Sequence, residues 1–526
     1  MTTRPDSSLH GIRSVLFITA DQWSGALLSA LGHPCARTPH LDALAADGVL
    51  FRNHFTQCSP CGPSRTSLLT GLYLMNHRSA RNGTPLDARH TNLALEVRKA
   101  GYDPVLFGYT DTSPDPRGRH PRDPHLRRYE GVLPGMTVGT LMTEEFRPWR
   151  AALKAKGYDV PPRPIDIYRP VAESLAPDGS RRPRPIYTAE DSDTAFIADK
   201  TLEHLALHEH QPWFVHTVFL RPHPPLIAPE PYNTLITRGE VPPPRRLATP
   251  AAEAAQHPYL AHLLERQRRV GYYMGHEIDI QALSADENEY ADLAAVYYGL
   301  IAEVDAHVGR LIAHLKRTGE YDHTLIIFTT DHGEMLGDHW LFGKEGYFDR
   351  AYHIPLIIRD PRPQAGATRG RIIDAFTEAV DIMPTILDWL DVEVPVQIDG
   401  QSLLPFLEDR PPTNWRREVH WEFDFRDIVG QVPEQALGLT SDQCTLCVIR
   451  DQRYKYVHFT ALPPLFFDLA EDPDETVDRA GDPACRELVL AYAQKMLSWR
   501  MAHDERTLTN VFLGENGVTE RRGPRY

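Results

Sequence analysis

The stretch IRSVLFITA, residues 12–20, is a near-continuous apolar run that ends directly on Asp21. A run of this kind predicts a strand buried on both faces of a parallel sheet. A second run, TLIIFTT at residues 324–330, ends in the same way on Asp331. Because ligands of such sheets bind at the carboxyl ends of the strands, both acids are expected to lie at the functional edge.

Further segments extend this pattern along the chain. Residues 104–109, which end on Tyr109, and residues 213–220 are predicted as two more buried strands. Helices are predicted at 39–48, 91–100, 190–207 and 290–318. The last of these repeats apolar side chains at steps of three and four: Leu293, Val296, Leu300, Val304, Val308, Leu311 and Leu315. Alternating strands and helices predict an α/β fold with helices on both faces of one sheet.

Two regions and the C-terminal part depart from this alternation of buried strands and helices. Residues 112–187 and 221–256 are rich in Pro and Arg, which predicts long loops or insertions near the site. Beyond about residue 410 short strands and one helix follow, at 418–424, 446–450, 453–459 and 486–503. We therefore predict a catalytic domain at residues 1–410 and a smaller C-terminal α+β domain at residues 411–505. Residues 506–526 are predicted to form a tail that serves as an oligomerisation arm.

Composition limits the classes of function. The 526 residues include 56 basic and 71 acidic side chains, a net charge of −15, and no long basic run, so a nucleic-acid-binding face is not expected. An acidic protein that acts on anions needs a local positive site, and a metal ion is one way to make it. Neither a secretory signal nor an apolar run of about 18 residues is present, which predicts a cytoplasmic enzyme without a membrane partner. Six cysteines are too few to indicate a disulfide framework.

Residues 61–71, CGPSRTSLLTG, carry the most specific signal in the chain. They resemble the type I sulfatase signature, Cys-x-Pro-Ser-Arg followed by Thr-Gly, of the alkaline phosphatase superfamily. The order Asp21, Cys61, Asp331-His332 also resembles that family, and the similarity extends from about residue 12 to residue 480. The resemblance implies a large mixed, mainly parallel sheet between helices. It also implies that a maturation enzyme oxidises Cys61 to formylglycine.

Details of the sequence are most similar to the phosphonate monoester hydrolases within this family. They are RNGTPL at 81–86, FGYTD at 107–111, RPHPP at 221–225 and GK at 343–344. This resemblance implies hydrolysis of phosphonate monoesters and phosphodiesters, small anionic esters, with aryl sulfates as further substrates. The alternative within the family is an arylsulfatase or a choline-sulfatase-like enzyme. Enzymes of this type are often homodimers or homotetramers.

The resemblance also implies a role for each matching residue. One divalent ion would be held by Asp21, Gln22, Cys61, Asp331 and His332. Gln22 and His332 stand where many sulfatases have Asp and Asn. The added nitrogen favours Mn²⁺, Zn²⁺ or Fe²⁺ at least as much as Ca²⁺. Gln22 could instead support a ligand from behind.

The remaining site residues would act on the substrate. Arg65 would orient the hydrated aldehyde or form a structural ion pair. His223 and Lys344 would offset charge on the non-bridging oxygens, and His223 would protonate the leaving alcohol. Their alternatives are a packed loop histidine and a surface lysine. Asn82, Tyr109 and Asp111 would contact substrate, although an acid at position 111 would repel an anion.

A different class of protein is suggested by two Cys-x-x-Cys pairs. Cys58 with Cys61, and Cys444 with Cys447, have the spacing of zinc ligands or of a redox dithiol. Nearly 400 residues separate the pairs, and neither role explains the Pro-Ser-Arg string after Cys61. The hydrolase is therefore the favoured prediction.

Overall fold

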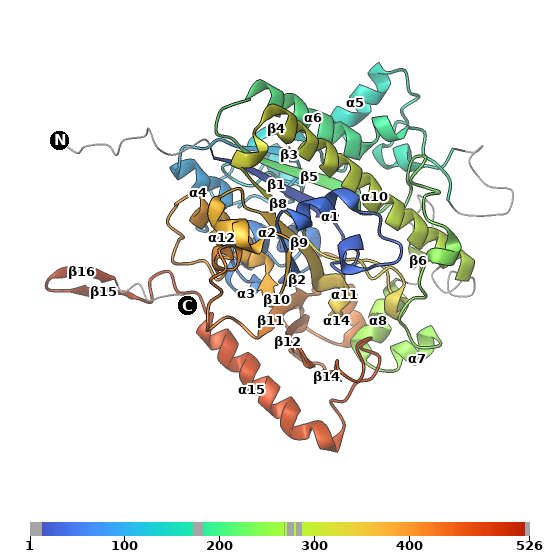
Figure 1. Cartoon of the computed structure of the whole chain (residues 1–526). Coiled ribbons are helices and arrows are strands. Elements are labelled where there is room, and N and C mark those ends of the chain that lie inside the picture. Colours follow the sequence, from blue (N-terminus) through green and yellow to red (C-terminus); the bar gives the residue numbers. More distant parts are fainter. Residues whose placement is uncertain (1–12, 172–181, 268, 271–277, 280–286, 521–526) are drawn as a thin grey trace.

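A computed structural model describes residues 13–171, 182–267, 269–270, 278–279 and 287–520. Its centre is a mixed sheet of eight strands (Figure 1), namely β1 (Ser14–Asp21), β2 (Val49–Phe55), β3 (Pro104–Gly108), β4 (Thr137–Leu141), β5 (Phe214–Pro222), β8 (Thr324–Thr330), β9 (His353–Arg359) and β10 (Arg371–Glu378). Their order is β10-β2-β9-β8-β1-β5-β3-β4. The block from β8 to β4 is parallel, β10 and β2 form a second parallel pair, and β9 is antiparallel to both its neighbours. The predicted mixed, mainly parallel sheet is confirmed.

Helices cover both faces of this sheet, so both faces of β1 are buried and its sequence is apolar throughout. They include α1 (Pro39–Ala46), α2 (Cys61–Thr70), α4 (Leu93–Lys99), α6 (Asp193–Leu207), α10 (Glu287–Thr318) and α12 (Ile382–Trp389). Successive side chains of a strand point to opposite faces. Leu16 and Ile18 therefore join the core beneath α1, α6 and α10, whereas Val15 and Phe17 pack beneath α2, α4 and α12.

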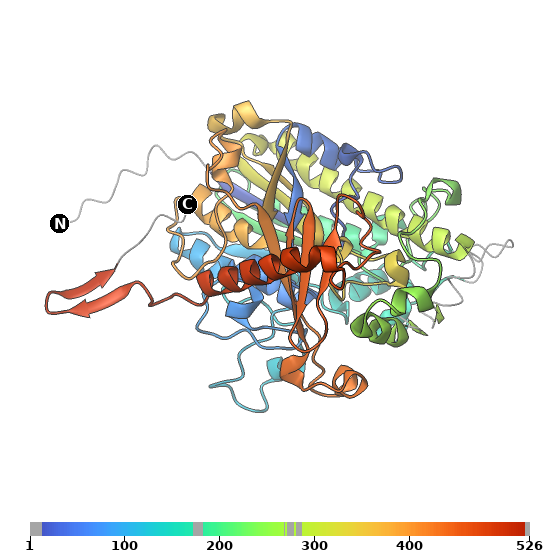
Figure 2. The same ribbon diagram turned by 90° about the horizontal axis from the view of Figure 1, so that it is seen from below.

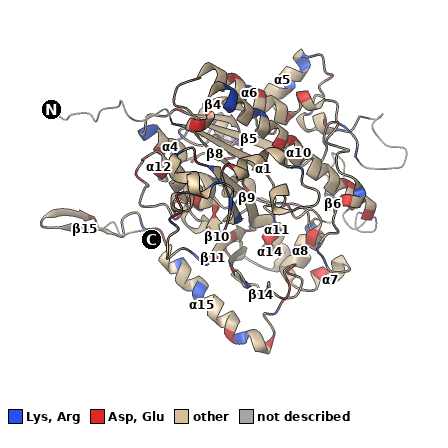
Figure 3. Ribbon diagram, viewed as in Figure 1, with Lys and Arg blue, Asp and Glu red and all other residues tan. Residues whose placement is uncertain are grey.

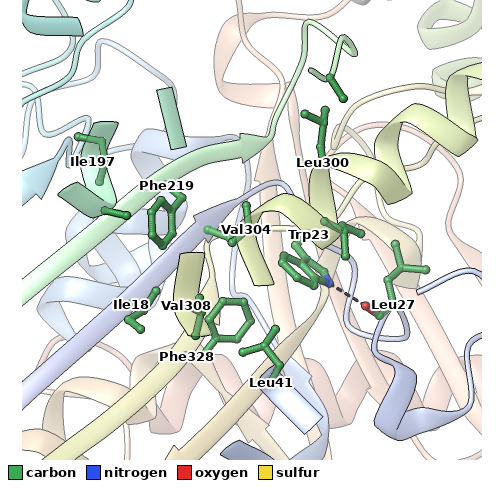
Figure 4. Packing of buried hydrophobic residues seen from close by; sticks show 14 of the residues in the cluster. Ile18, Trp23, Leu27, Leu41, Ile197, Phe219, Leu300, Val304, Val308 and Phe328 are labelled. Carbon is green, nitrogen blue, oxygen red and sulfur yellow. Dashed lines mark hydrogen bonds between the residues drawn. The ribbon is translucent and has the colours of Figure 1, made fainter. Parts of the chain in front are cut away.

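The first of these cores is shown in Figure 4, where Ile18 and Phe328 lie close to Val304 and Val308 of α10. The four side chains are fully buried. Each contributes about 1.5–3 kcal/mol through burial of apolar surface. This packing fixes the strand ends at which the predicted site residues lie.

A second, antiparallel sheet follows the main one in the chain. It consists of β11 (Glu418–Asp424), β12 (Thr445–Asp451), β13 (Tyr454–Phe459) and β14 (Leu465–Asp468), and α15 (Arg486–Ala502) lies across it (Figure 2). Met496 of α15 packs on Ile449 and Tyr456. The sheet also packs on the main body, where Trp421 stacks on Phe55 with ring centroids 5.8 Å apart. The predicted α+β region is confirmed, and the domain boundary at residue 410 stays a prediction.

The predicted loop over 112–187 is partly wrong. It contains strand β4 and helix α5 (Arg147–Ala155), and 221–256 contains the short helix α7 (Pro250–Ala254). Residues 172–181 lie outside the described part. Strand β4 is short, half-exposed and interrupted by Gly139, and α5 buries only Trp149 and Leu153, so neither has a strong apolar pattern.

The tail also has structure that was not predicted. Strands β15 (Val511–Gly514) and β16 (Gly517–Glu520) form a hairpin that projects from the body in Figure 1. Figure 3 shows acidic and basic residues interspersed on helices such as α10 and α15, whereas the hairpin is mostly uncharged. Shorter elements are α3 (Leu74–His77), α8 (Pro258–Arg266), α11 (Asp349–Tyr352), α13 (Leu404–Leu407), α14 (Val432–Leu437), β6 (Arg269–Val270) and β7 (Ile278–Asp279).

Candidate active site

Two adjacent strands deliver the acidic residues of the site. Strand β1 ends on Asp21, and Asp331 and His332 follow directly after β8. The parallel register pairs Ala20 with Thr330, so the two strands end side by side. All three side chains are buried, with at most 1% of their surface exposed. The predicted meeting of Asp21 and Asp331 at one edge of the sheet is confirmed.

Cys61 is the first residue of helix α2, every residue of which is buried. The Ser64 hydroxyl donates to the Asp331 carbonyl at 2.5 Å, which ties the first turn of α2 to the end of β8. Asn82 Oδ1 accepts a hydrogen bond from the Gly62 amide at 2.8 Å. The start of α2 is thereby fixed against the sheet edge, and residue 61 points into the group of acids.

Four side chains form a compact set of metal-ligand atoms: Asp21, Cys61, Asp331 and His332. One ligand atom of each lies within 4.8 Å of all the others. His332 Nε2 is 3.2 Å from Cys61 Sγ, 3.6 Å from Asp331 Oδ2 and 3.8 Å from Asp21 Oδ1. Burial, and then the charge of Asp21, raise the pKa of the Cys61 thiol well above its usual value.

The donor set fits a divalent cation. Asp21 Oδ1 is buried and has no hydrogen-bond partner among the residues described. His332 Nδ1 is 3.1 Å from the Gly333 carbonyl, and this contact places the proton on Nδ1 and leaves Nε2 as a ligand. Burial lowers the pKa of His332 well below its usual value, which keeps the imidazole neutral. Two carboxylates and an imidazole suit Mn²⁺ or Zn²⁺, and Ca²⁺ less well.

Arg65 lies behind these ligands. Its guanidinium pairs with Asp21 Oδ2 at 2.9 Å and with Asp331 Oδ2 at 3.0 Å, and it packs on the Tyr109 ring at 4.3 Å. Tyr109 in turn donates its hydroxyl proton to Asp21 Oδ2 at 2.5 Å. Arg65 thus holds both carboxylates, as in its ion-pair alternative, and Tyr109 holds Asp21. The predicted orientation of the hydrated aldehyde by Arg65 and the predicted substrate contact of Tyr109 stay predictions.

Gln22 links the ligand group to Lys344. Its Oε1 accepts from Lys344 Nζ at 2.7 Å, and its amide nitrogen donates to Glu334. Glu334 belongs to the sequence string after β8, but no role for it was predicted. Gln22 therefore supports the site from beside the ligands, and its predicted role as a ligand stays untested.

Lys344 and His223 lie together at the wall of the site. Lys344 Nζ is 3.2 Å from His223 Nε2, and His223 Nδ1 is 2.8 Å from the Pro224 carbonyl. The proton on Nδ1 faces the carbonyl, so Nε2 accepts from Lys344. Burial, and then Lys344, lower the pKa of His223 to about 3. Burial lowers the pKa of Lys344, but the charges of Cys61 and Asp21 outweigh it and leave the pKa raised.

Arg221 fixes the loop that carries His223. The guanidinium is fully buried and donates to the carbonyls of His223 at 2.9 Å and Pro225 at 2.8 Å. Asp193, at the start of α6, holds Arg221 in an ion pair of 3.2 Å. Arg221 lies within the motif at 221–225, but its role could not be predicted from the sequence because its partner Asp193 lies 28 residues earlier in the chain.

The site opens into a cavity of about 530 Å³. It is lined by Asp21 and Cys61 of the ligand group, by Lys344 and His223, and by residues of the 112–187 region. Asn82, Tyr109 and Asp111 also line it, so all three predicted substrate-contacting residues border one space. The pKa of Asp111 is raised to about 8, mainly by burial; Arg65 opposes this shift, and the charges of Asp21 and Glu130 add to it.

The zinc or redox alternative finds no support in the geometry. Cys61 is the only one of the four paired cysteines that joins a described group of possible metal ligands. Cys58 Sγ contacts the Ser67 hydroxyl at 3.4 Å, and Cys447 Sγ lies 2.9 Å from Arg500. Among the described residues, no group of possible metal ligands contains Cys58, Cys444 or Cys447.

Comparison with protein-family models places the chain in a family. The sulfatase model matches residues 13–392, and a model described as N-sulphoglucosamine sulphohydrolase, C-terminal, matches residues 337–502. This chain belongs to the sulfatase family of the alkaline phosphatase superfamily and is a hydrolase of ester bonds. The resemblance predicted from residues 61–71 is confirmed.

Individual relatives are similar over nearly the whole chain. The multifunctional alkaline phosphatase superfamily protein PehA of Trinickia caryophylli is 46% identical over 97% of this chain and 99% of its own length. The phosphonate monoester hydrolase of Agrobacterium radiobacter is 47% identical, with a TM-score of 0.91 over 97% of this chain and all of that one. The phosphonate monoester hydrolase SpPMH from Silicibacter pomeroyi is 42% identical, also with a TM-score of 0.91, over 98% and 100%. Within the described residues, no helix is both long and apolar enough to cross a membrane.

Proposed function

We propose that this chain hydrolyses phosphonate monoesters and phosphodiesters, and that sulfate monoesters are further substrates. The observation that carries this proposal is the position of residue 61. It lies 3.2 Å from His332 among two buried aspartates, with Lys344 and His223 at the wall of the same cavity. The similarity to two phosphonate monoester hydrolases supports the choice of ester.

One divalent ion would be held by Asp21, Asp331, His332 and residue 61. A bound ion would supply positive charge for the substrate oxygens and lower the pKa of the attacking hydroxyl. Arg65 balances the charge on Oδ2 of both aspartates and keeps Oδ1 of Asp21 directed at the site. Tyr109 adds a hydrogen bond to the same Oδ2 oxygen.

Residue 61 would act as formylglycine, produced from the cysteine by a maturation enzyme. Its hydrated aldehyde would supply the attacking hydroxyl, whose oxygen becomes bonded to phosphorus or sulfur. Loss of the proton of the second hydroxyl would then break the carbon–oxygen bond to the product group and regenerate the aldehyde. A thiol at this position is a poor nucleophile, since burial opposes its ionisation. Cys61 is the first residue of α2, and the helix dipole favours negative charge there.

Lys344 and His223 would act on the substrate oxygens. Lys344 lies within hydrogen-bonding reach of the residue 61 side chain and carries a raised pKa, so it stays charged at neutral pH. It would offset negative charge on the ester. In the free enzyme His223 is neutral and accepts from Lys344, so the proton for the leaving alcohol would come from the Lys344–His223 pair.

A sulfatase acting mainly on aryl sulfates is the second candidate. The family match favours it, as does an arylsulfatase of Clostridium perfringens that is 25% identical over 92% of this chain. Sulfate monoesters and phosphonate monoesters both carry one negative charge. Comparing kcat/KM for a phenyl phosphonate ester and an aryl sulfate decides between them, because a sulfate preference of several hundredfold would overturn our first choice.

We also propose that the tail is an arm that contacts a second copy in a homodimer or homotetramer. Phe512 and Leu513 of the hairpin expose 70% and 75% of their surface, and Leu508 and Val518 are similarly exposed. Apolar side chains in this arrangement favour burial against another chain. Light scattering of the full chain and of residues 1–505 tests this. The same number of chains per particle in both proteins would contradict it.

A further inference from the structure

One side of the cavity is lined by acidic residues. We call this side the outer wall and define it by Asp111, Tyr129, Glu130, Glu144, Phe146 and Ile165. Its three carboxylates come from the region between β3 and α5. Glu130 accepts a hydrogen bond from the Glu144 amide at 2.5 Å, and Glu144 accepts the Tyr129 hydroxyl proton. These contacts hold the two glutamates side by side.

Asp111 is the most unusual member of the outer wall. Its side chain borders the cavity although the residue exposes only 7% of its surface. No residue that the structure describes donates a hydrogen bond to this carboxylate or forms an ion pair with it. The backbone there has φ of +50°, a left-handed conformation that is uncommon for an aspartate. Burial keeps much of this carboxyl protonated in the free enzyme although Arg65 opposes the shift of its pKa, and a bound cation would favour the ionised form.

At neutral pH the raised pKa values of Asp111 and Glu130 leave these carboxyls partly protonated, and few nearby cations compensate the charge that remains. Arg163 also borders the cavity, but Asp166 lies 4.0 Å from it. Glu145 borders the cavity too and pairs with Arg147 at 2.5 Å. Arg128 acts on Glu130, yet burial and the charge of Glu144 still raise the pKa of Glu130 to about 7. A cation placed against this wall would stabilise the ionised carboxylates.

From this arrangement we infer that the cavity selects zwitterionic esters, in which the organic part carries an ammonium group that binds against Asp111, Glu130 and Glu144. The inference rests on the proposed function and specifies its substrate class. Lys344 and the metal-ligand group provide a site for the anionic phosphorus or sulfur centre, and the outer wall provides the opposite charge. Tyr129 and Phe146 add aromatic surface of the kind that binds alkylammonium groups.

Matched pairs of esters test this inference. One pair places the charge on the alcohol: 4-(trimethylammoniomethyl)phenyl phenylphosphonate and its uncharged isostere, the 4-neopentylphenyl ester. A second pair places it on the acid: 4-nitrophenyl aminomethylphosphonate and 4-nitrophenyl ethylphosphonate. The quantity measured is the ratio of kcat/KM between the charged and uncharged member of each pair.

The ratio is compared between the natural chain and the variant Asp111→Asn/Glu130→Gln. This comparison removes the intrinsic difference in leaving-group reactivity, because both proteins act on the same esters. For at least one pair we expect the ratio to fall about tenfold in the variant, since a charge pair in a partly buried site is weakly screened. The single variant Glu144→Gln, at an exposed residue, should lower it in the same direction and serves if the double variant does not fold.

Glu209→Gln is the matched control, because Glu209 is an exposed acid between α6 and β5, at the opposite edge of the sheet. It should leave both ratios unchanged. Ratios that change less than twofold in the outer-wall variants would overturn the inference. Hydrolysis of the uncharged esters tests the proposed function separately. If no ester is hydrolysed, the dissociation constants of the same pairs are measured on Cys61→Ala protein. The charged member of a pair should still bind about tenfold more tightly than the uncharged member. Equal dissociation constants would also overturn the inference.

Discussion

The floor of the cavity and its outer wall are built from different parts of the fold. The floor consists of Asp21, residue 61, Asp331 and His332, which lie at the ends of buried strands and at the start of a buried helix. The outer wall comes mostly from the partly exposed chain between β3 and α5, together with Ile165 after α5. Rigid core elements thus hold the reacting groups, and irregular chain provides the groups that distinguish substrates. Changes to the floor should abolish turnover, whereas changes to the wall should alter selectivity.

The largest effect is expected at the nucleophile. Cys61→Ala removes both the attacking group and one metal-ligand position, and kcat should fall by about 10⁴-fold or more. The measurement is turnover of an aryl phosphonate ester, with circular dichroism and thermal unfolding as controls for the fold. Residual activity above a few per cent of the natural chain would show that residue 61 is not the nucleophile.

The next largest effect is expected at the metal ligands. Asp331→Asn should lower the bound divalent metal from about one per chain to a small fraction and reduce kcat/KM about a thousandfold, several kcal/mol of lost charge stabilisation. Metal content is measured by mass spectrometry of the purified protein and activity in parallel. Chelation of the natural chain should have the same effect and be reversed by Mn²⁺ or Zn²⁺. Full activity in metal-free protein would contradict the assignment of the floor.

A smaller effect is expected at Arg221, which holds the loop that carries His223. Arg221→Lys loses one of the two hydrogen bonds that hold the carbonyls of His223 and Pro225. A displaced His223 should lower kcat/KM about 10- to 100-fold. The loss should be greater for esters of poor leaving groups, since these depend most on proton donation. A uniform loss for good and poor leaving groups would indicate a purely structural role.

Asp193→Asn provides the matched change for Arg221. It keeps the shape of the partner at 3.2 Å but removes its charge. The variant should reproduce the dependence on leaving group with a smaller loss. Unchanged behaviour in Asp193→Asn together with a large loss in Arg221→Lys would show that the ion pair does not position the loop.

The smallest expected effect is a loss of protein stability at low pH that is caused by the buried side chain of His77. Burial, and then His90 and Arg78, lower the pKa of His77 to about 3, and His77 Nε2 lies 2.9 Å from the Ser67 hydroxyl of α2. Between the unfolded pKa near 6.5 and pH 3 the unfolded chain binds a proton that the folded chain does not. Stability should therefore fall as pH decreases through this range, by up to about 1.4 kcal/mol per pH unit for this group.

The variant His77→Gln checks this sign. Its free energy of unfolding should decrease less than that of the natural chain as the pH falls from 6.5 to 4. Denaturant unfolding at several pH values measures the difference. Parallel curves for the two proteins would contradict the assignment of an uncharged, buried His77.

The sequence predicts the floor better than the wall for a physical reason. Asp21, Cys61 and Asp331 follow short apolar runs or lie within a specific local string, so local patterns are sufficient to find them. Strands β2, β9 and β10 were not predicted, although they complete one side of the sheet.

Contacts between distant segments also could not be predicted from local sequence patterns. Arg221 meets Asp193 across 28 residues, and Gln22 meets Glu334 across 312. The acidity of the outer wall depends on β4 and α5 bringing Glu130 and Glu144 to the cavity. A region predicted as loop gave no basis for that arrangement.

The most direct test of the central claim is the chemical state of residue 61 in active enzyme. Trypsin releases residues 53–65, NHFTQCSPCGPSR, which contain both Cys58 and Cys61. After alkylation of free thiols, our account predicts a peptide with one alkylated cysteine, Cys58, and the mass of an aldehyde at residue 61. A peptide from fully active enzyme in which both cysteines are alkylated would contradict it.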